Sequence, residues 1–152
     1  MIKYIQSFFA AAGKNACYAF CLYDVAKEYL EKHGLPILVN ELEALEMGVS
    51  RGYINFNFSD YDDPDAFYVT KPHLFLRGLT GIDWTARKEG RDYIALPGEY
   101  VIEFSALSEK NGGLGIGHFW RTRNNPLQRS NSSEKGFIYS KRVFQPIAGG
   151  KK

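Results

Sequence analysis

The sequence has little of the residues that carry most covalent and metal chemistry in enzymes. Its 152 residues include two cysteines and three histidines, which are Cys17, Cys21, His33, His73 and His118. Two cysteines do not make a disulfide scaffold, and two so close together fit a reducing cytoplasm better than an oxidising compartment. The histidines are scattered and do not match the spacing of the common zinc frameworks. We therefore expect no metal and no other cofactor.

Net charge and long apolar runs are also scarce. The formal charge of +2 supplies no strong field to attract nucleic acid or an anionic membrane. The nearest basic group, formed by Arg121, Arg123 and Arg129, is predicted to lie in or next to a loop and to be solvated. The apolar part of residues 1–12 is too short for a spanning helix and too interrupted for a signal peptide. We expect a cytoplasmic protein without nucleic-acid or membrane partners, and its oligomeric state stays open.

Aromatic residues are abundant, at 15% of the chain, and comprise 11 Phe, 10 Tyr and 2 Trp. The apolar share of 45% and the charged share of 24% are typical of an ordinary globular protein. The length fits one domain that can bury a core without disulfide or metal support. We expect a single domain over residues 1–148, followed by a disordered tail at 149–152.

The first third of the chain predicts helices. In residues 16–32 apolar side chains recur at a spacing of three or four, as on one face of a helix: Ala19, Leu22, Tyr23, Ala26 and Leu30. Asn15 is the expected N-cap of this helix, and Gly34 is expected to end it. A second helix is expected from Asn40, where Glu43 completes a capping box, to near Gly52.

After residue 52 the apolar period changes from helical to alternating. We expect strands at 54–58, 66–70, 82–86, 93–96, 100–105, 116–122 and 137–140. Pro72 is expected to open a short helix that Gly78 closes. The short connections favour antiparallel hairpins. The predicted fold class is therefore α+β, with helices first and a mostly antiparallel sheet after them.

Cys17 is the first candidate catalytic residue. It falls in the first turn of the predicted helix, where the helix dipole and unpaired backbone amides favour a thiolate. Lys14 adds a nearby cation, and the same amides could serve as an oxyanion hole. The alternative is that Cys17 is a small buried apolar residue, which is common for a free cysteine. Cys21, one helical turn later, is expected in the core.

His118 is the second candidate and lies in a predicted strand. Alternation along this strand puts Ile116, His118 and Trp120 on one face. An imidazole opposite a helix N-terminus can pair with a thiol, acting first as a base and later as an acid. The alternative is a core histidine satisfied by an ordinary hydrogen bond.

A cysteine on a helix, followed about a hundred residues later by a histidine on a strand, resembles the papain-like cysteine peptidase clan. Residues 16–28, beginning Ala-Cys-Tyr-Ala-Phe-Cys-Leu, look like the Gly-Cys-Tyr-type helix of a small family of bacterial and phage-encoded proteins with this core. Residues 52–55, 83–89 and 117–119 are similar to further segments of that family, so the resemblance extends from about Gly13 to Ser140. It implies a papain-like domain whose N-terminal helix carries Cys17 and whose sheet carries His118.

The chain departs from the pattern of an active papain-like peptidase at two positions. The clan has a glutamine before its cysteine that helps to form the oxyanion hole, whereas Ala11 stands six residues before Cys17. The clan also has an Asn or Asp that orients the histidine ring. The resemblance puts Ser140 at that third position, with Asn124 or Asn125 as substitutes. A serine accepts a hydrogen bond from the imidazole N–H but does not stabilise an imidazolium as a carboxylate does.

Two functions follow from this reading of the sequence. The first is a cysteine peptidase or amidase in which Cys17, His118 and Ser140 cleave a peptide or protein substrate through an acyl-thioenzyme. The second is a non-catalytic binding or accessory protein on the same scaffold, whose aromatic residues bind a peptide or a partner protein. A metal-binding module is the third alternative, and bound zinc would be its sign.

Overall fold

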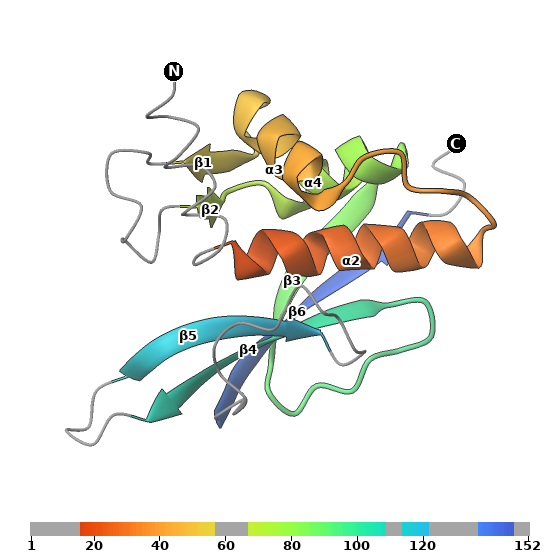
Figure 1. Ribbon diagram of the computed structural model, residues 1–152. Coiled ribbons are helices and arrows are strands. Elements are labelled where there is room, and N and C mark those ends of the chain that lie inside the picture. The colour runs from red at the N-terminus through yellow and green to blue at the C-terminus, as the bar shows by residue number, and fades with distance from the viewer. Residues whose placement is uncertain (1–15, 57–66, 109–113, 122–136, 148–152) are drawn as a thin grey trace.

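The computed structural model describes residues 16–56, 67–108, 114–121 and 137–147 (Figure 1). The described helices are α2 (Cys17–Lys32), α3 (Glu41–Ser50) and α4 (Pro72–Thr80). The described strands are β1 (Ile54–Phe56), β2 (Phe67–Val69), β3 (Trp84–Gly90), β4 (Tyr100–Ser108), β5 (Leu114–Arg121) and β6 (Phe137–Pro146). The predicted α+β class is confirmed. The predicted tail at 149–152 lies outside the described residues.

Helix α2 lies between two layers (Figure 1). On one side it packs against α3 and α4, which accompany a small antiparallel sheet of β1 and β2. On the other side it crosses a four-stranded sheet with the order β3-β6-β4-β5. Every neighbouring pair in that sheet is antiparallel, as the short connections predicted. The start of α2 and the strand that contains His118 therefore face each other across one interface.

The core forms around α2. The predicted apolar stripe of this helix is buried along its whole length, from Ala19 to Leu30. Cys21 and Val25 are also buried, because the helix is covered on two sides rather than one. Trp84, Tyr100, Ile102 and Phe144 complete the core from the sheet. A central helix of this kind hides residues on its second face as well, including the acidic Asp24.

The predicted N-cap is correct for α3 and wrong for α2. At the start of α3, the Glu43 amide donates to Asn40 Oδ1 at 2.8 Å and the Asn40 amide donates to Glu43 Oε1 at 2.9 Å. This reciprocal pair is the predicted capping box. At the start of α2, by contrast, the N-cap is Ala16, without a side-chain hydrogen bond, rather than the predicted Asn15.

Several predicted elements differ from those of the structure. Strand β3 runs to Gly90 and β6 to Pro146, beyond the ends expected at 86 and 140. Helix α4 runs through Gly78 to Thr80 and ends at Gly81, which has φ 80°. A Cβ at Gly78 would lie 3.0 Å from Met47 Cε, so this glycine allows close packing against α3 rather than ending the helix. Residues 93–96 form no strand and belong to the irregular connection between β3 and β4. Among the described helices, none is long and apolar enough to cross a membrane.

Candidate functional site

Cys17 is the first residue of α2, and its sulfur lies beside the backbone of Phe119 on β5. Burial raises the pKa of this thiol above its ordinary value. The backbone amides of Phe119, Tyr18 and Cys17 itself act in the opposite direction, as expected at a helix start, but burial outweighs them. The amides of the helix start thus favour the thiolate as predicted, but the net direction of the pKa follows burial, as in the alternative of a buried cysteine. Lys14, the expected cation, lies outside the described residues.

His118 pairs with Ser105 in the register of β5 with β4, and β5 is an edge strand of the sheet. The side chain of His118 lies outside the described residues. The residues that follow it at 119 and 121 face α2, since the Phe119 ring stacks on Tyr18 and Arg121 bonds to the helix. Strand alternation assigns the position between them, Trp120, to the other face of the sheet, and the sequence pattern groups 118 with 120. The pairing of Cys17 with His118 stays a prediction.

Ser140 is buried on β6, and its Oγ accepts a hydrogen bond from Arg142 Nη1 at 2.6 Å. Although β6 follows β5 in sequence, β4 lies between them in the sheet. Phe104 on β4 pairs with Ser140 on one side and with Phe119 on the other. Two strand spacings, about 9–10 Å, therefore separate the backbones of Ser140 and β5. The substitutes Asn124 and Asn125 lie outside the described residues.

Aromatic side chains pack beside Cys17 at the start of α2. The rings of Tyr18 and Phe119 stack with their centroids 4.2 Å apart, and Phe104 lies 4.9 Å from Phe119. The Arg142 guanidinium lies over both phenylalanine rings, at 5.8 and 5.5 Å from their centroids. Burial raises the pKa of Tyr18, and the charge of Arg142 opposes that shift. We call Cys17, Tyr18, Phe104, Phe119 and Arg142 the helix-start cluster.

A buried ionic network anchors the rest of α2. Arg121 donates through Nε to Asp24 Oδ2 at 3.1 Å and through Nη2 to Glu28 Oε1. Its Nη1 donates to the carbonyl of Val101 at 2.9 Å. The side chain of Arg121 is only 5% exposed. Arg121 lies within the strand expected at 116–122, but the expectation that it is solvated is wrong, because it ends β5 on the face covered by α2. The other two arginines of that group, at 123 and 129, lie outside the described residues.

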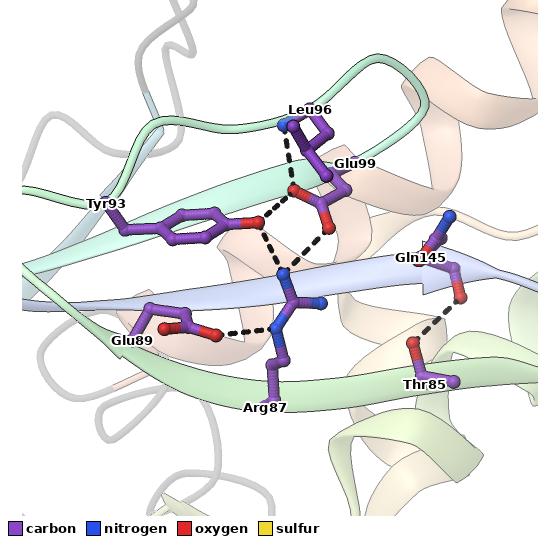
Figure 2. A network of polar contacts seen from close by, with 7 residues as sticks. All are labelled: Thr85, Arg87, Glu89, Tyr93, Leu96, Glu99 and Gln145. Atoms are coloured by element: carbon purple, nitrogen blue, oxygen red, sulfur yellow. Dashed lines mark hydrogen bonds and ion pairs between the residues drawn. The ribbon is translucent and has the colours of Figure 1, made fainter.

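A second ionic network holds the connection between β3 and β4, which we call the 91–99 loop (Figure 2). Arg87 on β3 donates to Glu99 Oε2 and to Glu89 Oε2, each at 2.7 Å. Glu99 Oε1 accepts from the Tyr93 hydroxyl at 2.6 Å and from the Leu96 amide at 2.9 Å. The Glu99 side chain is 3% exposed. We call Arg87, Glu89, Tyr93 and Glu99 the Glu99 brace.

The Glu99 brace has a clear electrostatic consequence. Hydrogen bonds from Tyr93, from the Leu96 amide and from Arg87 lower the pKa of Glu99 to about 2. The hydrogen bond to Glu99 in turn raises the pKa of Tyr93. Sequence reasoning missed this network, and the Pro-Gly pair at 97–98 was its only local signal. Gly98 has φ 88°, a conformation that favours glycine in a tight turn.

Across the part of the chain that the structure describes, no group of three or more His, Cys, Asp or Glu side chains is placed to hold a metal ion. Neither Cys17 nor Cys21 forms a disulfide within the described residues. Comparison with protein-family models, with curated proteins and with solved structures yields no significant match. The resemblance to the papain-like clan therefore stays a prediction, and the function is argued from the geometry alone.

Proposed function

We propose that the protein is a non-catalytic binding or accessory protein on a papain-like arrangement of helix and sheet. The papain-like part is supported by α2, which begins with Cys17 and packs on an antiparallel sheet whose edge strand contains His118. The non-catalytic part is carried by one observation. Burial raises the pKa of the Cys17 thiol, whereas a cysteine nucleophile needs its thiolate.

The surroundings of Cys17 support the same reading. The position expected for the third catalytic residue holds Ser140, whose hydroxyl already accepts a hydrogen bond from Arg142. The aromatic rings near Cys17 pack on one another and on Arg142. In this proposal the helix-start cluster is a packing unit that fixes α2 on the sheet. The partner would be a peptide or a protein, and the close spacing of the two cysteines in the sequence favours a cytoplasmic setting.

A cysteine peptidase or amidase is the second candidate, and one observation favours it. The Cys17 sulfur lies beside backbone amides of its own helix turn and of Phe119, the residue directly after His118. Amides in such a place can stabilise the oxyanion of an acyl-transfer reaction. In this candidate the Cys17 sulfur would attack an amide carbonyl and His118 would pass the thiol proton to the leaving amine, which gives an acyl-thioenzyme. Water would then hydrolyse this thioester and restore the thiol.

Alkylation of Cys17 distinguishes the two candidates. We would measure its rate with iodoacetamide from pH 5 to pH 10 in a Cys21→Ala background, with Cys17→Ala as the blank. The proposal predicts slower alkylation than that of a free thiol, with a midpoint above the ordinary value of about 8.5. A midpoint well below that value, moved upward by His118→Ala, would instead establish the catalytic pair.

A further inference from the structure

Two cations lie directly opposite each other on the face of the sheet that packs against α2. Lys88 on β3 pairs with Arg142 on β6, which pairs in turn with Ile102 on β4. Ile102 is the register partner of Arg121, whose guanidinium bonds to α2, so this row of residues belongs to the helix-facing side. We call Lys88 and Arg142 the cation pair. Like charges directly opposite in a sheet repel each other, so an anion bound between them relieves a destabilising contact.

The neighbouring cations on the opposite face are neutralised by carboxylates of the protein. Arg87 on β3 bonds to Glu89 and Glu99, as Figure 2 shows. Lys141 on β6 stands between Glu89 and Glu103 in the register of the sheet. On the helix-facing side, by contrast, no carboxylate of the described residues forms an ion pair with either member of the cation pair. The same two strands therefore neutralise their cations on one side and leave the cation pair uncompensated on the other.

Arg142 is fixed in place without an ionic partner. Its guanidinium lies 5.8 Å from the centre of the Phe104 ring and 5.5 Å from that of Phe119. Nη1 donates to Ser140 Oγ at 2.6 Å, which leaves the Nε and Nη2 edge of the guanidinium for another acceptor. Aromatic contacts and one neutral hydrogen bond orient the group but do not cancel its charge. Because Arg142 is half-buried, water screens this charge less than it would on an exposed side chain.

A further donor and open space lie beside the cation pair. The Ser140 hydroxyl accepts from Arg142, and its own proton has no acceptor among the described residues. Gly90 pairs with Ser140 in the register, and a Cβ at Gly90 would meet nothing within 4 Å apart from its chain neighbours. A glycine in a strand is found where another molecule approaches the backbone closely. The site therefore combines two cations, a hydroxyl donor and room for a ligand.

We propose that the cation pair binds a carboxylate in an acidic segment of the partner. This inference rests on the proposed function and deepens it, because it names the chemistry of the peptide or protein that is bound. The Nε and Nη2 groups of Arg142 donate two parallel hydrogen bonds to one carboxylate, a geometry that a guanidinium favours. The Lys88 ammonium adds a second charge from the exposed edge strand, and the Ser140 hydroxyl adds a third donor.

The size of the site favours an acidic peptide over other anionic partners. A protein that binds nucleic acid contacts a series of phosphates, and these contacts need many cations. An anionic membrane is bound by clusters of about 4–8 lysines and arginines. Two cations beside aromatic rings suit one carboxylate or an adjacent pair of carboxylates, as an acidic peptide segment supplies.

An NMR titration tests the proposal. The full chain, with isotope-labelled arginine side chains, is titrated with a capped hexapeptide of glutamate and, separately, with a capped hexapeptide of glutamine. We expect the Nε–H signal of Arg142, assigned by its loss in Arg142→Lys, to shift and saturate with the glutamate peptide alone. Equal shifts with the two peptides would overturn the proposal, and so would saturation by inorganic phosphate but not by the glutamate peptide.

Two charge-matched variants separate a site from general electrostatic attraction. Lys88→Met and Lys27→Met each remove one exposed lysine, but Lys27 lies on α2. We expect Lys88→Met to weaken binding of the glutamate peptide about fivefold and Lys27→Met to leave it nearly unchanged. Arg142→Lys keeps the charge without the fork and should weaken binding about tenfold.

Equal binding by the two lysine variants would refute the site. Because Lys88 is exposed, its variant tests the proposal even if substitutions at Arg142 disturb the fold. None of these outcomes depends on the alkylation of Cys17, so the two proposals fail separately.

Discussion

Two arginines in this protein each hold a pair of carboxylates, yet they serve different regions. Arg121 is buried between Asp24 and Glu28 and locks α2 onto the edge of the sheet. Arg87 is 36% exposed and, with Glu99 and Glu89, shapes a loop on the surface. The first network closes an interface and the second holds a surface loop.

This difference bears on where function resides. The residue that the sequence singled out, Cys17, lies in the closed region, where burial raises its pKa. The 91–99 loop lies at the surface, where the Arg87 network holds it, and no sequence motif indicated this network. The residue type and its place in the sequence are thus a weaker guide to function than the burial of that residue in the fold. The predictions that follow test this contrast.

The largest expected effect is on stability, from Arg121→Met. This substitution removes the buried Arg121 cation from Asp24 and Glu28, although Glu28 keeps its ion pair with Lys32. It should lower the free energy of unfolding by about 3–5 kcal/mol. Urea unfolding followed by circular dichroism measures it. The matched variant Arg87→Met should cost less, because Arg87 is 36% exposed and Glu99 keeps its hydrogen bonds from the Tyr93 hydroxyl and the Leu96 amide. Equal losses in the two variants would contradict the distinction between the networks.

The second prediction concerns acid. Because the pKa of Glu99 in the folded protein is about 2, below its ordinary value of 4.5, its ionised form stabilises the folded loop. That contribution is complete above pH 4.5 and is lost as the pH falls towards 2. We expect the NMR signal of the Leu96 amide to stay constant down to about pH 4 and to shift below it.

The control for the acid prediction is Glu99→Gln, in which the shift of the Leu96 amide should disappear. A wild-type midpoint at or above 4.5 would show that the brace does not hold the carboxylate in solution.

The third prediction is a modest effect of Ser140→Ala. Its hydroxyl is a buried acceptor for Arg142, so removing it should cost about 1 kcal/mol of stability. The same urea titration measures it. A loss of thiol reactivity at Cys17 in this variant would link the two residues and favour the catalytic reading.

The smallest stability effect is expected at Ile94 and Leu96 in the 91–99 loop. Because both side chains face water, the Ile94→Ser, Leu96→Ser variant should unfold within about 0.5 kcal/mol of the wild type. Urea unfolding again measures it. A loss as large as that of a core truncation would mean that these side chains pack against the protein.

The sequence predicted the parts of the fold whose signals are local. The apolar stripe of α2 and the capping box at Asn40 each depend on residues of a single helix. Both predictions are confirmed. The strand expected at 93–96 is absent because hydrogen bonds from the Tyr93 hydroxyl and the Leu96 amide to the Glu99 side chain hold these residues in a loop instead of a ladder. Arg87 and Glu99 are 12 residues apart, and Lys141 comes from another strand, so no local pattern reveals the brace.

The candidate site likewise depends on contacts between residues that are far apart in the sequence. That Cys17 opens a helix could be predicted, and the structure agrees. Its pKa depends on the way β5 covers it, which spacing along the chain does not encode. Chain order likewise suggests that β5 and β6 are neighbours, whereas the sheet inserts β4 between them and separates Ser140 from β5.

One binding measurement tests the account most directly. The affinity of the glutamate peptide would be determined for the wild type, for Cys17→Ala and for Lys88→Met under identical conditions. The account predicts that Cys17→Ala binds as the wild type does and that Lys88→Met loses about fivefold. Strong loss in Cys17→Ala with unchanged binding by Lys88→Met would contradict it and return the function to Cys17.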